Sequence, residues 1–151
     1  MSEPLQIKEV LERDGIYLSA PHGSSMWPLL RDHEDIACIL KKPPQGLKKY
    51  DVALYIRSNG AYVLHRVLDV TDGVYTMCGD NQTVKEHGIK EEQVIGVLDS
   101  FYRGDKHYKC SGVRYSLYVW LWCLSLKFRK FLMKVVGFTE GRILHLYDKK
   151  N

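Results

Sequence analysis

The stretch YDVALYIRSNGAYVLHRVLDVTDGVYTMCGDN, residues 50–81, decides the fold of this 151-residue chain. Apolar side chains recur there at every second position, which is typical of β-strands. The strand-like runs are 52–56, 61–70 and 74–78. Two strong hairpin signals, Asn59-Gly60 and Asp72-Gly73, separate these runs. The stretch therefore predicts a meander of three antiparallel strands.

Further strand signals lie on both sides of this meander. Residues 35–40 resemble a buried strand, and residues 93–102 predict another that continues over 107–110. Before them, a loose helical face over 5–13 ends at Asp14-Gly15. The sequence therefore predicts a mainly β fold, an antiparallel β-meander, in a domain spanning residues 1–110.

Composition excludes several classes of protein. Hydrophobic residues make up 45% and charged residues 26% of the chain, as in globular and not disordered proteins. The net charge of +4 is too small to indicate nucleic-acid binding. The polar N-terminus lacks the features of a signal peptide, and no run of 18 apolar residues predicts a spanning helix. We expect a cytoplasmic protein, located in part at the membrane surface.

No metal or cofactor is predicted. The four cysteines form no CxxC pair and fit no zinc pattern, which favours buried, reduced thiols. The histidines other than His65 show no metal-ligand spacing among themselves. One of them, His22, is close enough to Ser25 in sequence to reach the same groove.

The last third of the chain, 111–151, predicts a helical extension. Residues 115–136 contain no turn former and are rich in aromatic and apolar side chains. A lysine stripe (Lys127, Lys130 and Lys134), together with Trp120 and Trp122, is the pattern of an amphipathic helix lying on an anionic membrane. The alternatives are a helix that packs across the sheet or in a dimer, and a tilted or re-entrant insertion.

Three short motifs carry residues suited to catalysis. Gly23-Ser24-Ser25-Met26-Trp27-Pro28 predicts a tight turn that could expose a nucleophilic hydroxyl beside its own N–H. His65, in Leu64-His65-Arg66-Val67, would lie on an apolar strand face as a neutral base, with Arg66 on the opposite face. Gly79-Asp80-Asn81 follows the next strand. Each motif also has an ordinary structural reading, as an N-cap, a core histidine or an Asx turn.

The set of motifs and their order resemble the catalytic boxes of type I signal peptidases. The S-M-x-P turn, the strand D-V-x-x-Y, H-R-V and G-D-N follow one another across residues 16–100. A histidine in the third box is similar to the endoplasmic-reticulum and archaeal branch of this family and its Gram-positive relatives. The resemblance implies a curled antiparallel sheet that binds its substrate as an added strand.

The resemblance also implies roles for individual residues. Ser25 would be the nucleophile, His65 the general base, and Asp80 the acid that orients His65, with Glu86 as the alternative acid. Ser25, through its backbone N–H, and Ser24 would stabilise the oxyanion.

The chain departs from the family pattern in three respects. Gly23 stands where the family usually has a serine that helps to stabilise the oxyanion. The usual second aspartate after G-D-N is missing, with Glu86 as the nearest substitute. No N-terminal membrane anchor is recognisable.

The sequence therefore predicts a serine endopeptidase that cleaves signal-like or leader-like peptides after small residues. Its partner would be a peptide or precursor protein in an extended conformation. The alternative is an inactive peptide-binding or membrane-associated adaptor on the same fold. For His65, desolvation and a nearby Asp80 act oppositely, so we expect a pKa within about a unit of 6.5.

Overall fold

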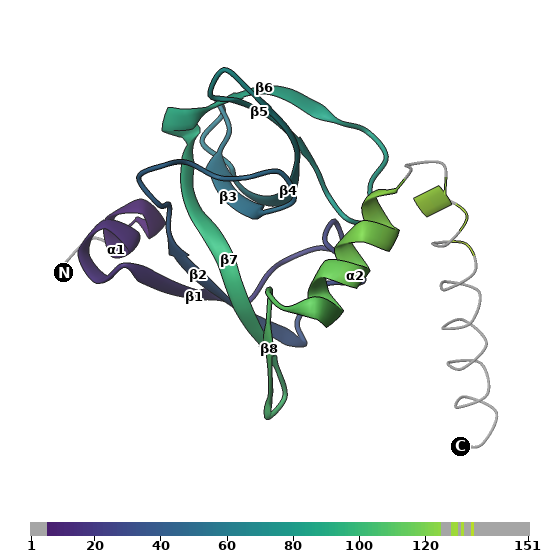
Figure 1. Ribbon diagram of the computed structural model, residues 1–151. Coiled ribbons are helices and arrows are strands. Elements are labelled where there is room, and N and C mark those ends of the chain that lie inside the picture. The colour runs from purple at the N-terminus through teal and green to yellow at the C-terminus, as the bar shows by residue number, and fades with distance from the viewer. Residues whose placement is uncertain (1–5, 125–127, 130, 132–133, 135–151) are drawn as a thin grey trace.

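The computed structural model describes residues 6–124, 128–129, 131 and 134, and within them the chain is mainly β (Figure 1). The predicted mainly β antiparallel fold with a C-terminal helix is confirmed. The helices are α1 (Ile7–Asp14), a 3-10 turn η1 (Glu91–Gln93) and α2 (Val113–Cys123). The strands are β1 (Ile16–Ser19), β2 (Asp35–Lys41), β3 (Val52–Ile56), β4 (Tyr62–Thr71), β5 (Val74–Cys78), β6 (Glu86–Lys90), β7 (Val94–Arg103) and β8 (Lys106–Lys109).

All strand pairs are antiparallel, in the order β1-β2-β7-β3-β4-β5-β6, with β8 paired to β7. The predicted meander is β3, β4 and β5 with both hairpin turns in place. Strand β7 then inserts between β2 and β3, which joins the meander to the N-terminal hairpin of β1 and β2. The continuation expected over 107–110 is instead a separate strand, β8, which turns back at Gly104.

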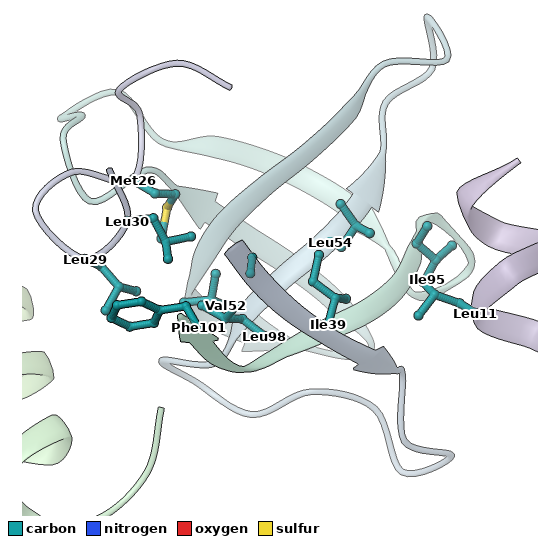
Figure 2. Close-up of a cluster of buried hydrophobic side chains, with 11 residues drawn as sticks. Leu11, Met26, Leu29, Leu30, Ile39, Val52, Leu54, Ile95, Leu98 and Phe101 are labelled. Carbon is teal, nitrogen blue, oxygen red and sulfur yellow. The ribbon is translucent and has the colours of Figure 1, made fainter. Parts of the chain in front are cut away.

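The sheet buries side chains on both faces, so the fold has two hydrophobic clusters. Strand β3 shows why: Val52 and Leu54 face the first cluster, while Ala53 and Tyr55 face the second. In Figure 2 the first cluster runs from Met26 and its neighbours at one end to residues of α1 and β7 at the other. The Ser25 turn is therefore anchored in the main core through the residue that follows it.

Two strand edges near the Ser25 turn have no neighbour among the described strands. Strand β1 pairs only with β2. The first part of β4, Tyr62–His65, pairs with β3 on one side, but β5 pairs with β4 only from Arg66 onward. An unpaired edge presents backbone N–H and C=O groups that can bind another extended chain.

Helix α2 packs on the sheet with one face and exposes the other. Tyr115 and Tyr118 are partly buried and Trp122 is 6% exposed, whereas Trp120 is 60% exposed. Trp122 donates from Nε1 to the Asp80 backbone oxygen at 2.8 Å. The sequence assigned both tryptophans to a membrane interface, but Trp122 belongs to the protein interior.

The predicted helix over 115–136 is described only in part. It begins at Val113 and its continuous described portion ends at Cys123, with Leu124 in a bend. Residues 125–127, 130, 132–133 and 135–136 lie outside the described residues, so the predicted lysine stripe can be placed only at Lys134, which is exposed. No helix within the described ranges is both long and apolar enough to cross a bilayer.

Candidate active site

The Ser25 turn is held by the loop that follows β5. The Asn81 N–H donates to the Ser25 carbonyl oxygen at 2.8 Å. The same oxygen would lie 2.5 Å from a Cβ built on Gly79, far inside contact distance, so only glycine permits this approach. The G-D-N motif thus supports the turn that carries the predicted nucleophile.

Ser25 and His65 line the same cavity, which has a volume of about 660 Å³. Ser25 reaches it from the turn after β1, and His65 from the middle of β4. Its walls include residues 17–20 of β1 and the segment after it, and residues 62–65 of β4, the two strand segments with unpaired edges. A chain lying in this cavity would therefore have both a hydroxyl and an imidazole beside it.

A hydrogen-bond chain fixes the tautomer of His65. The Tyr55 hydroxyl donates to Glu86 Oε2 at 2.8 Å and lies 3.3 Å from His65 Nδ1. Because a hydroxyl has one proton and Glu86 accepts it, Tyr55 must accept from His65 Nδ1–H. His65 Nε2 is then unprotonated and is the nitrogen that can act as a base.

Arg57 keeps Glu86, the last member of this hydrogen-bond chain, ionised. Its guanidinium donates to Glu86 from Nη2 at 2.6 Å and from Nε at 2.9 Å. These hydrogen bonds lower the pKa of Glu86, so the carboxylate stays charged at neutral pH. Burial, reinforced by Glu86, raises the pKa of Tyr55, which therefore stays a neutral hydroxyl. The hydrogen bonds from His65 through Tyr55 to Glu86 can therefore hold His65 in one tautomer over a wide pH range.

Burial dominates the protonation of His65. The side chain is only 4% exposed. Desolvation, with the charge of Arg57, lowers the pKa of His65 to about 4, while Glu86 and Asp80 oppose this shift. The sequence predicted a pKa within about a unit of 6.5, and this value has to be corrected because desolvation outweighs the two carboxylates.

Asp80 lies against Arg66 and makes no hydrogen bond to His65 among those of the described residues. Its oxygens accept from Arg66 Nε at 2.8 Å and Nη2 at 2.6 Å, and from the Tyr118 hydroxyl at 2.8 Å. Both members of the ion pair are fully buried. The expected contact between Asp80 and His65 is thus replaced by the ion pair between Asp80 and Arg66. The reason is that Asp80 lies on the same side of the sheet as Arg66, whereas His65 points to the other side. The alternative acid, Glu86, reaches His65 through Tyr55.

The oxyanion donors predicted at Ser24 and Ser25 differ in position. Ser24 is exposed, does not line the cavity, and its carbonyl accepts from the Trp27 N–H at 3.1 Å. The Ser25 N–H has no acceptor among the hydrogen bonds of the described residues. Of the two, only Ser25 lines the cavity, and its N–H, which has no acceptor among these hydrogen bonds, is the donor available to an oxyanion.

Sequence reasoning missed Tyr55 and Arg57 as members of this site. Both lie on or just after β3, and Tyr55 occupies the last position of the D-V-x-x-Y strand. The available signal was register: Tyr55 pairs with Val63, which shares a strand face with His65. A tyrosine at that place can therefore contact the imidazole.

No protein-family model matches the chain, and no curated protein is recovered as a relative.

The buried ion pair yields a stability prediction. Asp80→Asn removes one charge and leaves Arg66 charged and buried, which should lower the free energy of unfolding by about 3 kcal/mol or more. Denaturant unfolding of the two proteins measures the difference. Asp69→Asn, at an exposed position of β4, is the control and should change stability by less than about 0.5 kcal/mol. Equal stability of all three proteins would show that the pair does not hold the site together.

Proposed function

We propose that the chain is a serine endopeptidase with Ser25 as nucleophile and His65 as general base. The observation that supports the proposal is that both residues line one cavity while His65 Nδ1 lies 3.3 Å from the Tyr55 hydroxyl. Nε2 is thereby left as the proton acceptor. The resemblance of the motifs to type I signal peptidases supports the same assignment independently.

The reaction follows from these groups. As Ser25 Oγ attacks the substrate carbonyl, its proton moves to His65 Nε2, and the carbonyl oxygen becomes an oxyanion that accepts from the Ser25 N–H. His65 then donates the proton to the leaving amine, which departs and leaves an acyl-enzyme. Water, deprotonated by His65, hydrolyses the ester and restores Ser25. Glu86 and Tyr55 stabilise the imidazolium during both steps.

The substrate proposed is a signal-like or leader-like peptide in an extended conformation, cleaved after a small residue. The unpaired edges of β1 and of Tyr62–His65 supply backbone donors and acceptors on the walls of the cavity. Pairing with such an edge straightens the peptide and places alternate side chains toward the protein. The preference for small residues rests on the family resemblance.

Single-residue variants test the nucleophile. Ser25→Ala should abolish hydrolysis of peptides in a mass-spectrometric cleavage screen, and its unfolding transition should match that of the wild type. Ser24→Ala is the matched control, and because Ser24 lies outside the cavity its kcat should fall by less than ~10²-fold, the scale of a lost oxyanion donor.

An inactive Ser24→Ala variant beside a normal Ser25→Ala variant would overturn the assignment. A wild type that binds peptides as tightly as Ser25→Ala, but cleaves none, would favour the adaptor that is the alternative function.

The pH dependence of kcat/KM tests the base. Only neutral His65 accepts the serine proton, so activity should rise through one acidic limb near pH 4, where His65 titrates, and stay level to neutral pH. Glu86→Gln removes a negative charge and should move the limb lower. Arg57→Gln removes a positive charge and should move it higher. Activity that appears only above pH 8 would exclude His65 as the base.

We also propose that the exposed face of α2 binds an anionic membrane surface. Leu117, Trp120, Leu121 and Leu124 form a continuous apolar stripe, each more than 40% exposed. Exposed Arg114 at the start of the helix adds a positive charge, as does exposed Lys134 further along the chain. An apolar stripe with an exposed tryptophan and flanking cations matches an anionic lipid surface better than a neutral protein groove.

Vesicle binding tests this surface on the full chain, since α2 also completes the protein interior. Trp120→Ser with Leu121→Ser should reduce co-sedimentation with vesicles of phosphatidylglycerol and phosphatidylcholine. Val84→Ser, which removes an apolar side chain that is 81% exposed elsewhere, should not. Wild-type binding should weaken in high salt because lipid charges are screened. Equal sedimentation of all three proteins would contradict the proposal.

A further inference from the structure

Three metal-ligating side chains, His22, Asp32 and His33, lie close together, and one of them, His22, lines the Ser25 cavity. His22 lies between β1 and the Ser25 turn, and Asp32 and His33 lie in the turn before β2. One ligand atom from each lies within 4.8 Å of the others, and all three residues are exposed. The sequence showed no metal-ligand spacing among its histidines, because nine residues lie between His22 and the pair Asp32-His33.

The local backbone brings the two histidines together. His33 has a positive φ of 57°, unusual for a residue other than glycine. Its ring lies edge-on to that of His22, with centroids 5.3 Å apart, and its Nε2 lies 3.4 Å from Asp32 Oδ1. The neighbouring Arg31 is paired with Glu34 at 3.2 Å, which offsets its positive charge near the cluster.

The ligand set suits Zn²⁺. Two imidazoles and one carboxylate are the protein ligands of many zinc sites that keep a fourth position for water. Bond lengths near 2.0–2.1 Å in a tetrahedron place ligand atoms about 3.3 Å apart. The ligand atoms, now within 4.8 Å of one another, would need to close by at most about 1.5 Å, which rotation of exposed side chains can supply.

We propose that His22, Asp32 and His33 bind one Zn²⁺ ion and that this ion inhibits the peptidase. His22 is itself a lining residue of the cavity that contains Ser25. An ion bound there would occupy the rim of the cavity and tie the Ser25 turn to the chain before β2. Both effects oppose entry of an extended peptide. The inhibition rests on the proposed function, whereas zinc binding does not.

Binding is measured first, by calorimetric titration of tag-free Ser25→Ala protein with zinc chloride. The expected result is one ion per chain and no comparable heat with magnesium, which prefers oxygen ligands. Adding His22→Ala or His33→Ala should weaken binding by at least about tenfold, since one of only three ligands is lost. His107→Ala, at an exposed histidine on β8, is the control and should bind as before. Binding unchanged by His33→Ala, or lost only with His65→Ala, would overturn the site.

Inhibition is measured on the wild type and on His33→Ala, whose side chain does not line the cavity. Zinc at concentrations that saturate the site should lower kcat/KM of the wild type and should affect His33→Ala only at about tenfold higher concentration or more. A saturated wild type that hydrolyses peptide at its zinc-free rate would overturn the inhibitory role. A chain that binds zinc through these residues but cleaves no peptide would contradict the proposed function and leave the binding result standing.

Discussion

The buried ion pair between Arg66 and Asp80 is the interaction on which the rest of the site depends. It joins β4 to the loop after β5, and both side chains are fully buried, so an unpaired charge there would cost several kcal/mol. Arg66 also donates to the Tyr50 carbonyl oxygen at 2.9 Å and to the Tyr115 hydroxyl at 3.0 Å. A single guanidinium therefore connects the start of β3, the G-D-N loop and α2.

The ion pair also positions the residues next to it in sequence, His65 and Asn81. His65 precedes Arg66 on β4, so its imidazole points to the opposite face of the strand. Asn81 follows Asp80, and its N–H holds the Ser25 carbonyl. Arg129 adds to this support by donating to the Gly79 and Gln82 carbonyl oxygens at 3.0 and 3.1 Å. His65 and Asn81 are thus each adjacent in sequence to a member of the buried ion pair, and Asn81 links that pair to the Ser25 turn.

The meander was predictable because alternation and hairpin signals in residues 50–81 agree. Within the meander, register alone could have predicted which residues share a face with His65. Arg66 pairs with Cys78, and Asp80, two residues further on, lies on the same face as Arg66 and not as His65. Val67 and Glu86 both pair with Met77, so Glu86 lies on the face of His65. Strand β6 itself could not be predicted, because its sequence EHGIK is mostly polar, contains glycine and lacks the alternation of a strand. The meeting of His22 with Asp32 and His33 depends on a turn conformation that local sequence does not specify.

The contacts of α2 with the G-D-N loop have a thermodynamic consequence. Trp122 and Tyr118 donate hydrogen bonds to Asp80. The N–H of the next residue, Asn81, donates to the Ser25 carbonyl oxygen. Detachment of the helix and disorder of the Ser25 turn are therefore linked equilibria, in which each raises the probability of the other. By reciprocity, a peptide that orders the Ser25 turn must also tighten the attachment of α2 by the same free energy. Amide hydrogen exchange in α2 would then slow when a peptide occupies the cavity, although the exposed face of the helix does not touch that cavity.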